Sequence, residues 1–397
     1  MTNWKEYKLS DLMELKYGKD HKHLADGSYP LFGSGGIMRY VEKSIYEEES
    51  ILIPRKGTLS NLFYVNEPFW SVDTMFWSKI KQDKVLPKYL YYTLKTYNLA
   101  ELNVGSAVPS LTTEVLNKVD VTIPNIDTQT AIAEILSSLD DKIELNNKIN
   151  QELETLAQTL FKQWFIDYEF PNENGEPYKS SGGEMVDSEL GEIPKGWDKI
   201  KLKKLVTKSH TGADAITRAP IVDYDTGIKC ARVGDMTNNR SYHNWAFCKI
   251  NPEDYLRQKL GIGDIIVTRT ATLGINQIIR ENIDAVCNNG LIRLKIDKSI
   301  CDPMFVYVQF QGDIFKEWIN RISGDSSTRP NMQMDYLLDF NVIIPEKELM
   351  IFFTDSIKTY YDLIDENNRS NEELIKTRDT LLPKLISGEL EINEIGN

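Results

Sequence analysis

"VDVTIPNIDTQTAIAEILSSLDDKIELNNKINQELETL", residues 119–156, has a second copy in "FNVIIPEKELMIFFTDSIKTYYDLIDENNRSNEELIKT", residues 340–377. The two copies align without a gap at a constant shift of 221 residues, and 14 of the 52 aligned positions from Pro109 to Leu160 are identical. Two prolines and three asparagines match in register, which a shared apolar composition does not explain. A period this long indicates duplicated domains rather than a solenoid of short repeats.

Each copy predicts a short strand that ends in Ile-Pro, followed by a long helix of about 33 residues, or about 50 Å at the rise of an α-helix. Mostly apolar residues alternate at spacings of four and three along each helix, which is typical of a coiled-coil seam. The seam of the first helix comprises Ile132, Leu136, Leu139, Ile143, Asn146, Asn150, Leu153, Ala157 and Leu160. The seam of the second comprises Phe353, Ile357, Tyr360, Ile364, Asn367, Asn371, Leu374, Arg378 and Leu381.

Asparagine occupies the same two seam positions in both helices, although a polar seam residue costs stability. Such residues are a known way to fix the register and orientation of paired helices. If the helices pair antiparallel about a pseudo-twofold axis, Asn146 and Asn150 should meet Asn371 and Asn367. The alternative is that each helix is frayed near its middle and leaves these asparagines exposed.

The charge of the chain is distributed unevenly along its 397 residues. The total is −13, but residues 1–110 carry +1 and residues 197–330 carry +5, whereas residues 111–196 and 331–397 carry −11 and −8. The acid therefore belongs to the repeated helical segments and their flanks, and the regions between them are slightly basic. No apolar run approaches 18 residues and the N-terminus has no apolar signal core, so we expect a cytoplasmic protein. The four cysteines form no CxxC pair and are expected to be buried thiols.

The fold class predicted is α+β, with two globular α/β recognition domains separated by two long antiparallel coiled-coil helices in a pseudo-twofold internal repeat. Each half opens alike, with "WKEYKLSDL" from residue 4 and "WDKIKLKKL" from residue 197, and continues with strand-like runs and turn residues. A stretch rich in Pro, Gly, Ser and acid separates the halves. The predicted division is domain 1, helical region 1, linker, domain 2 and helical region 2, at residues 1–110, 111–170, 171–196, 197–330 and 331–397.

Motifs for bond chemistry are weak throughout the chain. "NEPF" at residues 66–69 departs from the Asn-Pro-Pro-aromatic motif of adenine methyltransferases, and "GSGG" at residues 33–36 lacks the glycine spacing of a dinucleotide loop. His21 and His23 are the one close histidine pair in the sequence and have no ligand partner at metal spacing. The sequence therefore predicts a protein that is not itself an enzyme and binds no metal.

Basic and small polar residues in the two middle regions suggest contacts with DNA. Arginine and lysine read guanine edges and phosphates, and asparagine reads adenine. "ESILIPRKGTLS" aligns with "GDIIVTRTATLG", which places Arg55 on Arg269. The structural alternative for these two arginines is a buried pair with a carboxylate, and any single candidate could be an ordinary surface residue. The DNA-binding candidates are Lys19, His21, Lys22, Ser34, Arg39, Arg55, Lys56, Thr58, Arg232, Arg240, Arg269, Thr270, Thr272, Asn288 and Asn289.

Five stretches resemble the specificity subunits of type I restriction–modification systems, and the resemblance extends over essentially the whole chain. They are "YPLFGSGGI" (29–37), "GSAVPSLT" (105–112), "VTIPNIDTQTAIAEILSSLDDKI" (121–143), "LFKQWFIDYEF" (160–170) and, most specifically, "PYKSSGGEMVDSELGEIPKGW" (177–197). The family commonly has Glu-Gln after Ile-Pro. Here Thr128 precedes Gln129 and the second repeat lacks the pair, which puts a role for that pair in doubt.

The resemblance implies a non-catalytic subunit in which each recognition domain reads one half of a bipartite asymmetric site on double-stranded DNA. It implies that the helices dock two modification subunits, which bind S-adenosylmethionine and methylate adenine, and that two restriction subunits add ATP and Mg. No cofactor is expected on this chain, and no membrane partner. Two alternatives stay open: a stand-alone sequence-specific DNA-binding regulator, and a coiled-coil scaffold without a DNA function.

Overall fold

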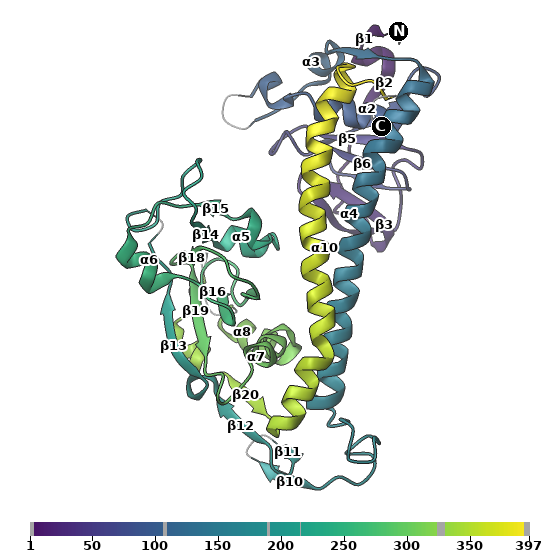
Figure 1. The fold of residues 1–397 in the computed structure, drawn as a ribbon. Helices are drawn as coiled ribbons and strands as arrows, with labels where there is room; N and C mark the ends of the chain where they lie inside the picture. The colour runs from purple at the N-terminus through teal and green to yellow at the C-terminus, as the bar shows by residue number, and fades with distance from the viewer. Residues whose placement is uncertain (1–3, 106–108, 189–190, 215, 324–329, 393–397) are drawn as a thin grey trace. The chain divides into compact units, whose positions relative to one another are not determined.

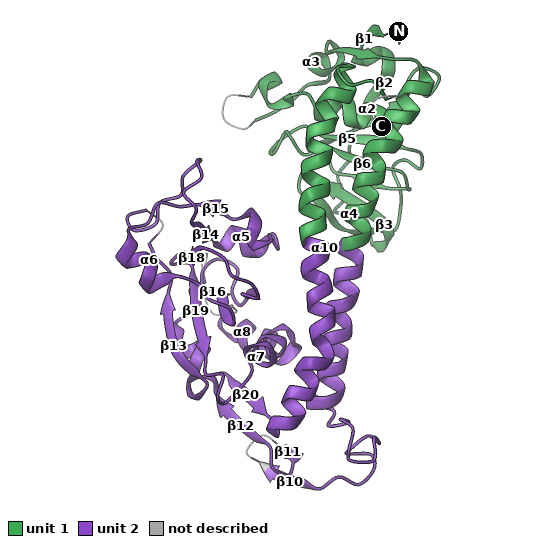
Figure 2. Cartoon of the chain, viewed as in Figure 1, with its two compact units in different colours: residues 1–146, 369–397 green, residues 147–368 purple. Residues whose placement is uncertain are grey.

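The structure, a computed structural model, describes residues 4–105, 109–188, 191–214, 216–323 and 330–392. Residues 106–108 and 189–190, which belong to two of the motifs quoted above, therefore lie outside the described part. The chain divides into two compact units, residues 1–146 with 369–397 and residues 147–368 (Figure 2). Each unit combines one predicted recognition domain with parts of both predicted helical regions. The finer boundaries stay a prediction.

The first unit contains three small sheets (Figure 1). The strand orders are β2-β8-β5-β6, β4-β3-β7 and β1-β9. The strands are β1 (Lys5–Lys8), β2 (Met13–Tyr17), β3 (Asp26–Gly33), β4 (Gly36–Val41), β5 (Ser50–Pro54), β6 (Phe63–Val65), β7 (Trp70–Ser71), β8 (Met75–Ile80) and β9 (Asp120–Ile123). The short helices are α1 (Leu9–Leu12), α2 (Pro87–Lys95), the 3-10 turn η1 (Leu99–Leu102) and α3 (Thr113–Asn117).

The second unit repeats this plan. Its strand orders are β13-β19-β16-β17, β15-β14-β18 and β12-β20. The strands are β12 (Asp198–Lys201), β13 (Val206–Thr211), β14 (Lys229–Ala231), β15 (Ala246–Phe247), β16 (Asp264–Thr268), β17 (Asn276–Ile278), β18 (Ala285–Cys287), β19 (Leu291–Ile296) and β20 (Asn341–Ile344). The short helices are η3 (Leu202–Lys204), α5 (Val233–Thr237), η4 (Tyr242–Asn244), α6 (Pro252–Gln258), α7 (Pro303–Gln311), α8 (Asp313–Ser323) and α9 (Met334–Leu338).

The two sets of sheets correspond strand for strand, so the duplication extends through the middle regions whose sequences have diverged. The central strands β5 and β16 are buried at every position. Their near-continuous apolar runs fit strands that are covered on both faces. In β16, Ile265 and Val267 belong to one hydrophobic core and Ile266 belongs to another on the opposite face. We call the globular parts, β1 to β9 and β12 to β20, module 1 and module 2.

Two long helices, α4 (Ile126–Phe161) and α10 (Lys347–Ser387), each contribute to both units and pair antiparallel within each (Figure 1). In the first unit, Asn146 Nδ2 donates to Asn371 Oδ1 at 2.8 Å. In the second, Asn367 Nδ2 donates to Asn150 Oδ1 at 2.8 Å. These are the partners that the repeat predicts, and the residues are buried or half-buried rather than frayed. Their role in fixing the register stays a prediction.

The predicted seam agrees with the burial along both helices, because each of its positions is buried or half-buried. The least expected member, Arg378, forms an ion pair with Asp140 across the first unit's helices, Nη1 to Oδ1 at 2.7 Å. The Tyr92 hydroxyl donates to the other oxygen of Asp140 at 2.6 Å. The charge of Arg378 in the seam is therefore compensated by the carboxylate of Asp140, which in turn accepts a hydrogen bond from the Tyr92 hydroxyl. Sequence spacing alone does not show these contacts.

The segment between the halves is more structured than its composition predicts. After α4 a short π-helical turn (Lys162–Ile166) leads to Phe170, whose ring stacks on Tyr178 and Trp197 with centroids 4.4 and 5.1 Å apart. Met185–Ser188 (β10) and Gly191–Pro194 (β11) then form a hairpin. The aromatic residues of the "LFKQWFIDYEF" motif thus belong to the core of the second unit.

Two further expectations concern the cysteines and the absence of a membrane-spanning segment. All four cysteines are free and buried, as predicted. Within the described residues, no helix combines the length and the apolar character that a membrane span requires.

Candidate nucleic-acid interface

Three loops of module 2 meet where β13, β16 and β18 end. The backbone N–H of Arg269, just after β16, donates to Gly290 O at 2.9 Å. Gly212 and Ala213, just after β13, donate to Leu291 O and Cys287 O at 3.1 and 2.8 Å. Asn288 N, just after β18, donates to the carbonyl of Ala231 at 2.9 Å. Because these bonds join backbone atoms, they hold the loops together whatever their side chains are.

Module 1 contains the same four bonds. Arg55 N donates to Thr74 O at 2.9 Å, Gly18 N to Met75 O at 3.0 Å, Lys19 N to Ser71 O at 2.8 Å, and Val72 N to Phe32 O at 3.0 Å. We call this arrangement the loop scaffold, and residues 55–58 and 269–272 the two arginine loops. The scaffold makes Gly18 equivalent to Gly212, and Val72–Thr74 equivalent to Asn288–Gly290. The candidate site is therefore duplicated at the level of the backbone.

A glycine at the end of β2 and β13 is required by close packing of the backbone. A Cβ atom built on Gly18 would lie 2.0 Å from Val72 O, and one on Gly212 would lie 2.0 Å from Cys287 O. A glycine in such a position lets two backbone segments approach closely. Sequence reasoning missed both residues, and a glycine directly after a strand was the signal that could have indicated them.

The two arginines of the loops are half-buried and lie at equivalent positions. Arg269 Nη2 donates to Asn331 Oδ1 at 3.0 Å and its Nε to Met332 O at 3.3 Å. Arg55 Nη1 donates to Asp73 O at 3.4 Å, and its guanidinium lies 5.3 Å from the centre of the Tyr17 ring. Within the described residues neither guanidinium forms an ion pair, so the structure does not show the buried carboxylate pair that was the alternative. A contact with DNA stays a prediction.

Other candidates surround these arginines. In module 1, Lys56 and Thr58 are exposed, and a Cβ on Gly57 would lie 3.4 Å from Ser34 Oγ. Lys19 and Lys22 are exposed and His21 is half-buried on the neighbouring loop. In module 2, Thr272 is exposed, Thr270 is half-buried and Asn289 Nδ2 donates to Asp214 Oδ2 at 3.1 Å. Asn288 uses its side-chain oxygen to accept from Gly290 N at 3.1 Å.

Three of the predicted arginines hold the protein together. Arg39 forms an ion pair with Asp26 at 2.8 Å and donates to two backbone carbonyls of the preceding loop. Arg232 and Arg240 both pair with the fully buried Asp235, at 3.0 and 3.2 Å. Hydrogen bonding to Asp235 raises the pKa of Arg232. These ion pairs give the three arginines a structural role, which the sequence alone does not distinguish from DNA binding. A DNA contact by these arginines stays a prediction.

The loop scaffold also brings forward residues that sequence reasoning missed. Asp73 and Thr74 of module 1 occupy the places of the predicted Asn289 and of Gly290. Tyr17, beside Arg55, is 51% exposed. The sequence did not indicate these residues, because the shift in residue number between equivalent positions of the two modules is not constant. It is 194 from Gly18 to Gly212 but 221 from Pro109 to Pro330.

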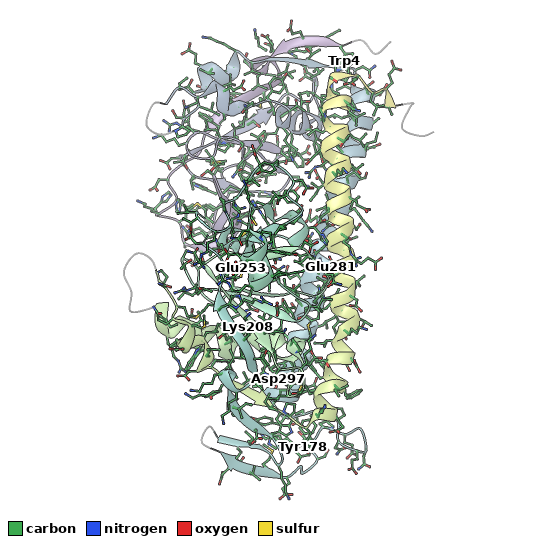
Figure 3. The ribbon with its side chains drawn as sticks, turned by 60° about the vertical axis from the view of Figure 1, so that its left-hand side comes forward. Trp4, Tyr178, Lys208, Glu253, Glu281 and Asp297 are labelled. Carbon is green, nitrogen blue, oxygen red and sulfur yellow. The ribbon has the colours of Figure 1, made fainter. Side chains whose placement is uncertain are left out.

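A buried polar cluster lies behind the arginine loop of module 2. Asp264, at the start of β16, pairs with Arg293 of β19, Oδ2 to Nη2 at 2.6 Å, and accepts from Gly261 N at 2.7 Å. His210 of β13 is the register partner of Arg293. Lys208, on the same strand, is labelled in Figure 3. Burial, followed by the positive charge of Arg293, holds the pKa of His210 below its usual 6.5.

We expect this histidine to make the stability of module 2 depend on pH. Below pH 6.5 the unfolded chain takes up a proton on His210 more readily than the folded chain, so the free energy of unfolding should fall as pH falls from 6.5 towards the lower folded pKa. His210→Gln should remove this part of the decline. The measurement is chemical denaturation at a series of pH values, with His23→Gln, an exposed histidine, as the control. An unchanged pH dependence in His210→Gln would contradict the assignment.

Comparisons with known proteins agree on one family. Residues 1–155 match the family model described as "Type I restriction modification DNA specificity domain". The specificity subunit of the type I restriction enzyme MjaIX of Methanocaldococcus jannaschii is 27% identical over 395 residues, covering 94% of this chain and 86% of that protein. The EcoBI specificity subunit of Escherichia coli is 22% identical, covering 86% and 74%.

A solved structure has the same fold. The S subunit of a type I restriction–modification system from M. genitalium superposes with a TM-score of 0.57, covering 97% of this chain and 96% of that one at 16% identity.

Proposed function

We infer that this chain belongs to the type I restriction–modification specificity family and is the subunit that recognises the DNA sequence for such a complex. The family match and the relatives that align with nearly the whole chain support this reading. The observation that carries the structural part of the proposal is the duplicated loop scaffold, which presents an arginine at the same place in each module. A protein that reads two half-sites needs two such surfaces.

Each module would read one half of a bipartite site. Arginine can bind a guanine edge through two hydrogen bonds, and exposed lysine or threonine can bind phosphates. Module 1 carries Lys56 and Asp73 where module 2 carries Thr270 and Asn289. Because these side chains offer different donors and acceptors on the same backbone, we propose that the two half-sites have different sequences and that the whole site is asymmetric.

We propose that the chemistry belongs to partner subunits. The relatives that align with most of this chain are named specificity subunits of type I restriction enzymes. Adenine methylation would then depend on two modification subunits that bind S-adenosylmethionine, and cleavage on two restriction subunits that use ATP and Mg. This chain would contribute the binding of double-stranded DNA and the choice of site.

The long helices are suited to bind the modification subunits. Besides their acidic residues they expose large apolar side chains at positions outside the seam. Among them are Leu145 (50% exposed), Leu156 (51%), Phe352 (55%) and Leu363 (40%). Apolar residues in exposed positions on a helix are typical of a surface that a protein partner covers.

Replacing Leu156 and Leu363 together with serine should weaken assembly with the modification subunits and leave the chain folded. Both side chains are exposed, so their loss removes little of the internal packing. Assembly would be measured by analytical ultracentrifugation of the mixed subunits. Glu114→Gln, an exposed change outside the long helices, is the control. Assembly at wild-type strength in the double variant would show that this face does not bind the partner.

The DNA contact is tested by Arg55→Ala and Arg269→Ala, each assembled with modification subunits. Loss of an arginine–base contact should lower the affinity for the site about tenfold or more, and loss of an arginine–phosphate contact should also lower the slope of log affinity against log salt by about 0.9. Lys118→Ala, which removes an exposed charge outside the loop scaffold, should leave the slope unchanged. An unchanged slope and affinity in both arginine variants would contradict the role given to the loops.

The same titration separates the alternatives. A stand-alone regulator should bind its site tightly without modification subunits, and a scaffold should not bind DNA with or without them. The proposed subunit should bind most tightly inside the complex.

A further inference from the structure

Each arginine loop is fastened to the segment that leads into a long helix. In module 2, Ala271 N donates to Pro330 O at 3.2 Å, and Met332 N donates to Arg269 O at 2.7 Å. In module 1, Gly57 N donates to Pro109 O at 3.3 Å, and Leu111 N donates to Arg55 O at 2.9 Å. The fastening residues belong to the repeat at the shift of 221. We call each pair of hydrogen bonds a clasp, because its two bonds flank the residue that follows the arginine, Lys56 in module 1 and Thr270 in module 2.

Both clasps depend on a left-handed residue. Gly57 has φ +94°, and its equivalent Ala271 has φ +63°. Glycine adopts this conformation freely, whereas in other L-residues it brings Cβ close to the following carbonyl at a cost of about 1–2 kcal/mol. Ala271 is exposed, so little packing of its methyl group offsets that cost. The left-handed turn is therefore maintained by the two clasp bonds, one from the N–H of the left-handed residue itself and one to the carbonyl two residues before it.

In module 2 the clasp also holds the side chain of the arginine. Asn331, between the two clasp residues, accepts from Arg269 Nη2 at 3.0 Å. The equivalent residue in module 1 is Ser110, and there Arg55 lies against Tyr17 instead. The backbone device is common to both modules, and the side-chain support differs. The left-handed conformation is present in both modules, and the local strain that it imposes on Ala271 is typical of a functional loop that must keep one conformation.

We propose that Ala271 and Gly57 are positioning residues for DNA reading: by taking the left-handed conformation, each closes the clasp that fixes its arginine loop in the reading position. This rests on the proposed function, because it concerns how the same loops meet DNA. It predicts that the conformation of residue 271, rather than the size of its side chain, determines how well the second half-site is read.

Three substitutions at one position separate conformation from size. Ala271→Val adds a β-branched side chain that strongly disfavours the left-handed region, whereas glycine and asparagine tolerate it. The readout is the ratio of affinities of the assembled complex for a duplex with the intact site and one with the second half-site scrambled. Ala271→Val should lower this ratio about tenfold, comparable to losing one arginine–base contact. Ala271→Gly and Ala271→Asn should keep the wild-type ratio, as should the control Gly234→Ala, whose added Cβ meets no atom within 4 Å.

The outcomes distinguish the inference from the function on which it rests. If the wild-type complex does not discriminate between the two duplexes, the proposed function fails. If the wild type discriminates and Ala271→Val does so equally, the positioning inference fails and the function stands. If Ala271→Asn loses discrimination as Ala271→Val does, side-chain size is responsible and the inference fails as well.

Module 1 supplies the test if Ala271→Val does not fold. Gly57→Val places its new atoms on an exposed loop, where the nearest neighbour of an added Cβ, Ser34 Oγ, is 3.4 Å away. It should reduce discrimination at the first half-site and leave the second unchanged. If Gly57→Val discriminates at the first half-site as strongly as the wild type does, the inference is overturned.

Discussion

Replacing Asp264 with asparagine is expected to lower the free energy of unfolding of module 2 by about 3–5 kcal/mol, because it leaves a buried charge without its partner. Arg293 and Asp264 form an ion pair at 2.6 Å with side-chain exposures of 9% and 3%. The ion pair is made by Arg293 Nη2, and Arg293 Nε has no hydrogen-bond partner among the described residues, so the guanidinium depends strongly on this carboxylate. Asp264 also begins β16, the strand that ends at the arginine loop.

The measurement is chemical denaturation of the wild-type chain and of the Asp264→Asn variant, monitored by tryptophan fluorescence. Glu114→Gln is the matched control, since it also removes the carboxylate of an ion pair, but one on the surface. The side chain of Glu114 is 79% exposed and that of its partner Lys118 is 71% exposed. An exposed pair of this kind contributes about 0–1 kcal/mol. If Asp264→Asn costs no more than Glu114→Gln, the buried pair does not stabilise module 2 as described.

The second large effect is expected in the paired helices. Replacing Asn371 with leucine should cost about 1–3 kcal/mol, because it leaves the buried amide of Asn146 without its acceptor. Asn146 is 3% exposed and donates to Asn371 at 2.8 Å. Changing Asn146 as well should recover most of the loss, since two leucines complete an apolar seam. The double variant should also hold the helix register less strictly.

Thermal denaturation of the two single variants and the double variant gives this comparison as a double-mutant cycle. Register is checked by a disulfide trap between cysteines introduced on the two helices. A single variant as stable as the wild type, or a double variant that loses the sum of both single effects, would contradict the pairing described for Asn146 and Asn371.

More of the paired helices than of the candidate site could be predicted from the sequence. Two prolines and three asparagines at a constant shift predicted the strand, the helix and the partner of Asn146, because a seam residue must face the other helix wherever the pairing is antiparallel. Charge balance also located the slightly basic middle regions. These inferences rest on local periodicity, which is a property of the sequence itself.

The loop scaffold could not be predicted in the same way. Its hydrogen bonds join backbone atoms, such as Arg269 N and Gly290 O, and place no requirement on most side chains. Insertions of different length in the two modules change the offset between equivalent residues, so an ungapped alignment loses them. Arg232 and Arg240 show a second limit, because nothing in the sequence indicates that Asp235 is buried between them.

Mapping methylated adenines in the DNA of cells that express this chain with the modification subunits proposed for it tests directly whether the chain chooses the methylated sequence. We expect methylation at one bipartite sequence with two different halves, and Arg269→Ala should relax or abolish recognition of one half while the other half stays the same. Methylation that does not depend on this chain, or a site whose two halves both change in Arg269→Ala, would contradict this expectation.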